Sequence, residues 1–186
     1  MNMKKLAAAL LSMCLVLCCT ACGEEETPEN DAEKQAAVAN MASPLTIGDM
    51  TIDLPLNFYV VADSNDTGTD KMPVVYMDQY PKREDNITFT MTGEKQNPEY
   101  YTATAIDNIM SSLLDDYSGV TSYIQDECWG YTAVKAKYKF NYEGKERLQT
   151  QYYIFTDDDM YLLTFTAEDE TVDAQFEQAI TTIVME

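Results

Sequence analysis

The segment with the most ligand-like pattern runs from residue 63 to 70 and reads DSNDTGTD. Its oxygen donors are Asp63, Asn65, Thr67 and Asp70. With Gly68 in the sixth place, the segment matches the start of a Ca²⁺-binding loop. The twelfth place, which needs a bidentate glutamate, is Val74, and strands are expected on both sides where such a loop has helices. The segment is therefore a candidate Ca²⁺ or small-ligand site, and a polar loop between strands explains it more simply.

Two acidic runs, Asp157–Asp159 and Glu168–Glu170, could also gather cations. Aspartate favours turns, and acidic side chains stabilise a helix N-terminus, so structural roles explain both runs. Nothing in the spacing singles out an acid and a nucleophile for a glycosidase. The chain has no histidine, which excludes Ser-His-Asp and Cys-His catalysis. We therefore expect a protein that is not an enzyme and has no resident cofactor.

Basic residues gather on one expected strand face. Lys135, Lys137 and Lys139 alternate along one strand, and we expect Arg147 of the next strand to lie beside them. In a chain with 12 Lys and Arg against 32 Asp and Glu, such a face could bind an acidic protein or an anionic cell-wall polymer. The alternative is a solvated face paired with neighbouring carboxylates, the commoner role of a charge run. The net charge of −20 makes nucleic acid a poor partner.

The N-terminus has the pattern of a bacterial secretory signal. Its parts are the basic residues Lys4 and Lys5, the apolar run Leu6–Leu17 and the small residues Thr20 and Ala21 before Cys22. The apolar run is too short to span a bilayer as a helix. The pattern resembles the lipobox of bacterial lipoproteins, with Cys19 where a lipobox usually has leucine. The resemblance implies diacylation of Cys22 and anchoring at the extracytoplasmic face of the membrane, whereas ordinary secretion would leave Cys22 free.

The expected organisation has three parts: a signal peptide over 1–21, lipidated Cys22 with a flexible acidic tether over 22–44, and one domain over 45–186. The tether lacks aromatic residues and is rich in Glu, Ala and Asn, so it cannot bury enough apolar surface to offset its ordering entropy. Cys128 then remains as the single cysteine of the domain. We expect it to be a small buried hydrophobic residue, beside Trp129 as a packing residue.

The domain reads as strands followed by a helix, a strand meander and a closing helix. Strands are predicted over residues 45–54, 58–62, 74–80, 86–92, 131–142, 148–155 and 160–166. Asn97-Pro98 predicts a helix start, with an apolar stripe from Ile106 to Leu114, and a last helix carries Val172, Phe176, Ala179, Ile180 and Ile183.

The last two predicted strands have apolar residues on both faces. We expect Tyr153, Phe155, Tyr161, Leu163 and Phe165 on one face and Tyr152, Ile154 and Leu162 on the other. Helices must then cover both faces. The fold class is α+β, with an antiparallel sheet sandwiched by helices.

Hydrophobic matching predicts the register of the hairpin after residue 131. A three-residue loop over 143–145 places Phe140 opposite Leu148. A two-residue loop over 143–144 would place Phe140 opposite Arg147, so we expect the longer loop.

The order of these elements, with DLPLNF over 53–58, Asn86-Ile87, GYTA over 130–133 and the closing helix at Phe176, resembles the PsbP-like superfamily. That superfamily includes an extrinsic photosystem II subunit, a Ran-binding nuclear transport factor and many small bacterial surface lipoproteins. The resemblance covers residues 45–186 and implies a PsbP-like α/β/α fold. Its motifs are structural rather than catalytic, so it implies a binding or accessory module and carries over no photosystem role.

Overall fold

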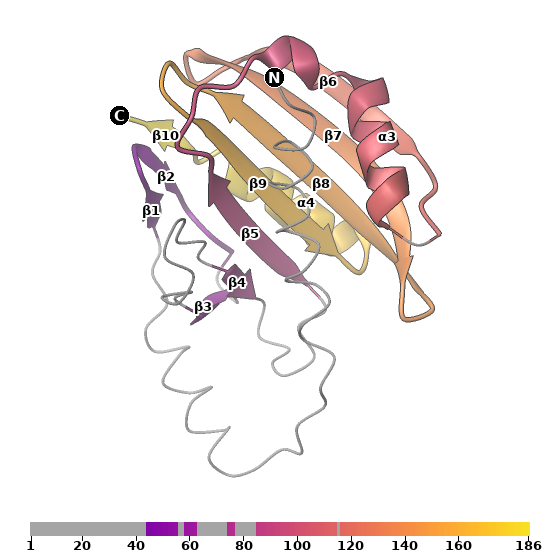
Figure 1. The fold of residues 1–186 in the computed structure, drawn as a ribbon. Helices are drawn as coiled ribbons and strands as arrows, with labels where there is room; N and C mark the ends of the chain where they lie inside the picture. Colours follow the sequence, from indigo (N-terminus) through magenta and orange to yellow (C-terminus); the bar gives the residue numbers. More distant parts are fainter. Residues whose placement is uncertain (1–43, 56–57, 63–73, 77–84, 115) are drawn as a thin grey trace.

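The computed structural model describes residues 44–55, 58–62, 74–76, 85–114 and 116–186 (Figure 1). The larger of its two antiparallel sheets has the strand order β3-β4-β5-β9-β8-β7-β6. These strands are β3 (Tyr59–Ala62), β4 (Val74–Tyr76), β5 (Asn86–Met91), β6 (Val120–Cys128), β7 (Tyr131–Tyr142), β8 (Lys145–Phe155) and β9 (Met160–Ala167). No helix among the described residues is long and apolar enough to cross a membrane.

The smaller sheet lies beside the inner strands β5 and β9 of the larger one (Figure 1). Its strands are β1 (Leu45–Ile47), β2 (Met50–Ile52) and β10 (Val184–Met185), in the order β1-β2-β10. The expected single run over 45–54 is thus a tight hairpin. Gly48 lies in its turn with φ of +56°, a left-handed conformation that glycine adopts without strain.

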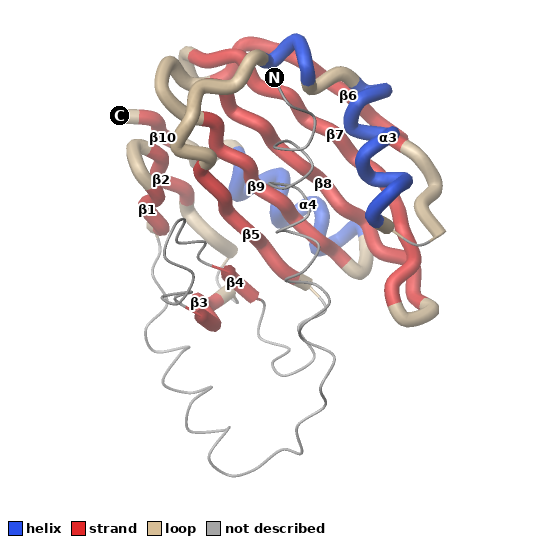
Figure 2. Tube along the Cα trace, in the orientation of Figure 1, coloured by secondary structure: helices blue, strands red, loops and turns tan. Residues whose placement is uncertain are grey.

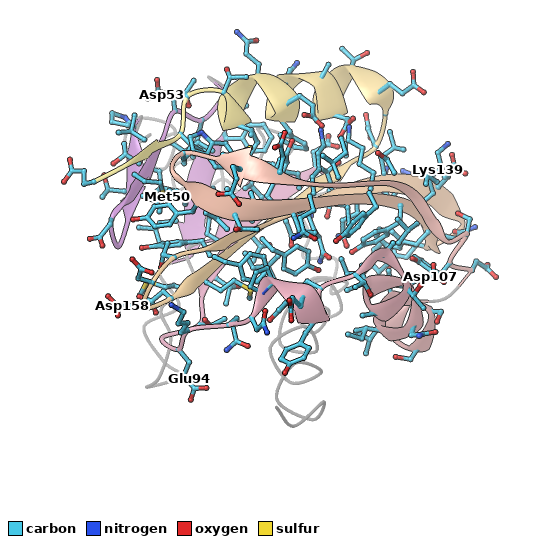
Figure 3. All side chains as sticks on the ribbon, turned by 90° about the horizontal axis from the view of Figure 1, so that it is seen from above. Met50, Asp53, Glu94, Asp107, Lys139 and Asp158 are labelled. Carbon is cyan, nitrogen blue, oxygen red and sulfur yellow. The ribbon has the colours of Figure 1, made fainter. Side chains whose placement is uncertain are left out.

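Two α-helices cover opposite faces of the larger sheet (Figure 2). Viewed from above, α4 (Glu170–Ile180) lies over one face, and α3 (Ala103–Leu113) lies under the other (Figure 3). The predicted α+β class, with a sheet between helices, is confirmed. The reason is the one that the pattern gave: the larger sheet is apolar on both faces, and each amphipathic helix buries one of them.

The first helix does not begin at Asn97-Pro98 as predicted. Those residues start a single 3-10 turn, η1 (Pro98–Tyr100), in which the Asn97 side chain accepts a hydrogen bond from the backbone N–H of Glu99 at 3.0 Å. The α-helix begins later, capped by Thr102. Between the two, Tyr101 leaves helical backbone geometry and buries its ring against Tyr153 and Phe155, with centroids 5.1 and 4.9 Å away. Packing of one aromatic side chain therefore divides the predicted helix.

Each face of the sheet has its own core. The α4-side core includes Ile87 and Phe89 of β5, Ile154 of β8, Leu163 of β9 and Phe176 of α4. The α3-side core consists of Tyr101, Ile106, Met110, Val134, Ala136, Tyr138, Phe140, Tyr153, Phe155, Met160 and Leu162. The small sheet extends the α4-side core through Met50 and Ile52, both fully buried.

The predicted grouping of faces on β8 and β9 is wrong. Tyr153 pairs with Leu162 and Phe155 with Met160, so these residues share the α3 side. The residues Tyr152, Ile154, Tyr161, Leu163 and Phe165 share the α4 side. The cause is the length of the connection Thr156–Asp159. Because this loop has four residues, an even number, each odd-numbered residue of β8 pairs with an even-numbered residue of β9, and paired residues share a face.

The predicted loop between β7 and β8 is also wrong. Tyr142 pairs with Lys145 and Phe140 with Arg147, which is the two-residue loop that hydrophobic matching rejected. Glu143 and Gly144 have φ of 52° and 78°, as a type I′ turn requires, and this turn matches the right-handed twist of the strands. Turn geometry therefore prevails over the match of apolar side chains.

Strand β6 was not delimited from the sequence. It pairs with β7 through a second two-residue turn, Trp129-Gly130, with φ of 55° and 83°. Its side chains are largely half-exposed or exposed, so it lacks the apolar alternation by which the other strands were recognised.

Candidate functional site

The predicted lysine face lies on the α4 side of β7. Lys135 donates a hydrogen bond to Glu177 of α4 at 2.6 Å, and Lys137 donates to Asp173 at 2.7 Å. The Nζ of Lys137 also lies 2.7 Å from Glu177 Oε1. The alternation that predicted a shared lysine face was right, but the lysines face a helix and not open solvent.

Polar side chains of β8 complete this cluster. The hydroxyl of Tyr152 donates to Glu177 at 2.8 Å, and that of Thr150 donates to Asp173 at 3.0 Å. Lys135 also lies over the Tyr152 ring, 5.3 Å from its centroid. We call Lys135, Lys137, Thr150, Tyr152, Asp173 and Glu177 the α4 clamp, since they join the helix to two strands.

The contacts of the α4 clamp shift the ionisation of its members. Burial alone would raise the pKa of Glu177, but hydrogen bonds from Lys135, Lys137 and Tyr152 outweigh it and hold the pKa below its ordinary value. Burial would lower the pKa of Lys137, but Asp173 and Glu177 raise it. Both shifts favour the charged forms, so the clamp is an ion-pair network at neutral pH.

A signal for the α4 clamp was present in the sequence. Residues two apart on a strand are separated by about 7 Å, and residues four apart on a helix by about 6 Å. The Lys135–Lys137 spacing on β7 therefore matches the Asp173–Glu177 spacing on α4. Recognising it required knowing that this helix crosses this strand.

The remaining predicted basic residues do not join the clamp. Lys139 pairs with Glu146 at 2.7 Å near the end of the β7–β8 hairpin, where the Glu146 side chain is 65% exposed. Arg147 lies on the opposite face of the sheet, so its predicted place beside the lysines is wrong. The two-residue loop puts it opposite Phe140 on the α3 side, where it is buried with one guanidinium nitrogen 3.7 Å from Glu168.

A second polar group, which sequence reasoning missed, crosses the α3 side of the sheet. Gln149 accepts from Tyr138 and donates to Thr166 at 2.8 Å. Gln151 accepts from Tyr153 at 2.5 Å and lies 3.4 Å from the Thr164 hydroxyl, to which it donates. The signal was the alternation of Gln149 and Gln151 along a strand. Gln149 therefore joins β7, β8 and β9, whereas Gln151 joins β8 to β9 and also bonds to Tyr153 of its own strand.

The predicted cation-binding residues Asp63, Asn65, Thr67 and Asp70 lie outside the described residues, as does Cys22. In the described part of the chain no three Cys, Asp or Glu side chains gather as metal ligands. Asp169 caps α4 by accepting from the N–H groups of Thr171 and Val172 at 2.8 and 3.0 Å. The structural role expected for the acidic run at the helix start is therefore confirmed.

Comparison with known proteins rests on solved structures, because no protein-family profile and no curated sequence matches the chain. The solution structure of cyanobacterial PsbP (CyanoP) from Synechocystis is similar over 74% of this chain and 87% of that chain, with a TM-score of 0.57 at 10% identity. The fold is PsbP-like. The crystal structure of PA94, a protein of unknown function from Pseudomonas aeruginosa, covers 79% of this chain and 99% of that chain, with a TM-score of 0.53 at 14% identity.

A more distant structure is that of LpqN, involved in cell envelope biogenesis of Mycobacterium tuberculosis. It covers 88% of this chain and 99% of that chain, with a TM-score of 0.45 at 14% identity. At these identities the PsbP-like likeness shows the fold alone.

Cys128 and Trp129 lie at the β6–β7 turn of the PsbP-like domain. Both contact the α4-side core, as expected of packing residues, but each is half-buried rather than buried. Burial, helped by Asp126 and Glu127, raises the pKa of the Cys128 thiol, so it stays protonated near neutral pH. Trp129 is unusual because a bulky residue adopts positive φ there, and its contact with the core offsets that strain.

Proposed function

We propose that this chain is a lipid-anchored protein of the bacterial cell envelope whose PsbP-like domain is a non-enzymatic binding or accessory module. The observation that carries the proposal is the N-terminal pattern of Lys4, Lys5 and the apolar run that ends shortly before Cys22. Diacylation of Cys22 would give two acyl chains, enough for stable anchoring. The acidic residues that follow would be repelled by anionic lipid head groups and keep the domain away from the bilayer surface.

A binding role suits the domain better than catalysis. Residues with reactive chemistry are already engaged in the fold: the lysines of β7 hold α4, and Arg147 lies against Glu168. The chain also has no histidine to act as a general base. By contrast, the outer edge of β6 carries exposed side chains over residues 124–127. A strand edge binds through backbone N–H and C=O groups and needs no catalytic residue.

The test of anchoring is the Cys22→Ser variant of the full-length chain in a bacterial host. The wild type should incorporate an alkyne-labelled fatty acid and enter the detergent phase on phase separation. Cys22→Ser should lose the label and enter the aqueous phase. Cys18→Ser is the matched control, since Cys18 lies in the expected signal peptide. A label that survives Cys22→Ser would refute the anchor, as would an unlabelled wild type.

A further inference from the structure

The two edge strands of the larger sheet, β3 and β6, differ in length. At one end β3 has four residues, and its pairing shifts register between Val60 and Ala62. At the other end β6 has nine residues, and among the described residues no strand pairs with its outer edge. An unpaired edge strand is a template for another strand, and proteins usually keep such edges short, bulged or charged with lysine. The β3 end is short and irregular, whereas β6 offers seven regularly paired residues, Ser122–Cys128.

The β6 edge has few features that would block pairing. Its sequence, VTSYIQDEC, contains no lysine and no proline, and its charges are the two adjacent carboxylates of Asp126 and Glu127 near one end. Its one irregularity lies between Val120 and Ser122, so Ser122–Cys128 pairs with β7 in regular register. In the middle of this regular part, Ile124 is 51% exposed, although it is a large apolar side chain.

We propose that two copies of this chain pair β6 against β6, antiparallel, around a twofold axis at Ile124. Residues opposite each other in this register have numbers that sum to 248, so Ile124 meets its own counterpart. Asp126 lies opposite Ser122 of the partner subunit, and Tyr123 lies opposite Gln125 of the partner subunit. The exposed isoleucine is buried against its copy, each Asp126 faces a hydroxyl, and no two like charges stand directly opposite.

Neighbouring symmetric registers are less favourable. An axis at Tyr123 would set Ile124 against Ser122 of the partner subunit, and an axis at Gln125 would set it against Asp126 of the partner subunit. An axis at Asp126 would oppose two carboxylates. Side chains that lie directly opposite each other in an antiparallel pair point to the same face of the sheet. A twofold axis between two copies of β6 must therefore pass through a residue position and not between two residues. The axis at Ile124 therefore best uses what β6 exposes. A second copy of the chain presents the complementary strand, because β6 is complementary to itself in this register.

Charge distinguishes a second copy from a basic extended peptide, the other occupant that Asp126 and Glu127 could attract. The chain carries a net charge of −20, so two copies repel each other, and salt screens that repulsion. Dimerisation should therefore strengthen as salt rises. Binding of a lysine-rich peptide to the same edge should weaken under the same change.

The first test is disulfide trapping in the purified full-length chain. In the proposed pair the two residues 124 have Cα atoms about 4.5–5.5 Å apart, within the range of a disulfide. Ile124→Cys should therefore give a covalent dimer on oxidation. Asp126→Cys is the matched control, because the two residues 126 lie four positions apart along the strands, roughly 13 Å. The native cysteines are present in every variant, so the wild type gives the background.

The second test is the oligomeric state of the wild type and Ile124→Lys, measured by light scattering at low and high salt. The wild type should dimerise more at high salt. Ile124→Lys should stay monomeric with unchanged circular dichroism, because the side chain is half-exposed and a central lysine blocks the edge. A wild type that is monomeric at both salt concentrations overturns the proposal. Equal trapping of Ile124→Cys and Asp126→Cys also overturns it, as does edge binding of a lysine-rich peptide by a monomer.

Discussion

Replacing Glu177 by glutamine tests whether the α4 clamp holds the helix to the sheet. The substitution keeps the shape of the side chain but removes the charge that Lys135, Lys137 and Tyr152 contact. A hydrogen bond to a charged group contributes about 1.5–3 kcal/mol when buried. The Glu177 side chain is 33% exposed, and Lys137 keeps Asp173, so we expect a loss of about 1–3 kcal/mol in the free energy of unfolding. Urea denaturation followed by tryptophan fluorescence and circular dichroism measures it.

The loss should depend on pH with a definite sign. The pKa of Glu177 is lowered in the folded chain, because the bonds from Lys135, Lys137 and Tyr152 outweigh the effect of burial. Its contribution to stability is therefore present above its ordinary pKa of 4.5 and is lost as pH falls through the lower folded value. The gap between wild type and Glu177→Gln should be widest near neutral pH and should close on acidification.

Glu146→Gln is the matched control for this prediction. It makes the same chemical change beside another lysine of β7, since Lys139 lies 2.7 Å from Glu146. That pair is exposed to solvent, so its loss should not measurably change the urea midpoint. Equal destabilisation by the two substitutions would refute the clamp, and so would a Glu177→Gln loss that is the same at acidic and neutral pH.

Four further substitutions, one of them a control, test the turns and a helix cap by urea denaturation. In Gly48→Ala the new Cβ would lie 2.5 Å from the Tyr161 hydroxyl, so strain and a lost hydrogen bond should cost about 2–4 kcal/mol. Gly93→Ala, with similar φ of 63° but no described atom within 4 Å, should cost only about 1–2 kcal/mol, and equal costs would contradict the close contact. Glu143→Asn should raise the urea midpoint, since asparagine suits the left-handed position of a type I′ turn, and a lowered midpoint would contradict that turn. Asp169→Ala should cost about 1 kcal/mol through the lost α4 cap, and an unchanged midpoint would contradict the cap.

The helices and the layered architecture were predictable because their signals are local. Val172, Phe176 and Ile180 recur at helical spacing, and all three are buried against the sheet. Apolar residues on both faces of β8 and β9 required cover on both sides, and α3 and α4 provide it. Periodicity within one element is enough to predict which side of that element is buried.

Strand register was not predictable, because it depends on turn geometry and on distant partners. Hydrophobic matching rejected Phe140 opposite Arg147, since a buried arginine looks unfavourable. The arginine is nevertheless buried, with Glu168 near its guanidinium group. The turn itself gave a weak signal, because Glu143 is an uncommon residue for its left-handed position.

The candidate site was predictable only in part, for a similar reason. Alternation along β7 correctly put Lys135 and Lys137 on one face. Their partners lie 42 and 36 residues later in the chain, on a helix whose path over the sheet no local pattern specifies. The exposed edge of β6 had no signal of its own, since the strand lacks the apolar alternation that marks a buried face.

The charge of the chain bears directly on the exposed β6 edge. A long unpaired edge invites uncontrolled association, and lysine or proline within the strand is the usual protection. Here a net charge of −20 would provide a general repulsion between free copies, which salt or a high local concentration can overcome. Anchoring of many copies to one membrane through Cys22 would supply such a concentration. The Ile124→Cys chain in membranes should therefore cross-link more completely than the double variant Ile124→Cys with Cys22→Ser does in solution at the same total amount of protein. Equal cross-linking of the two would show that the anchor does not promote β6 pairing.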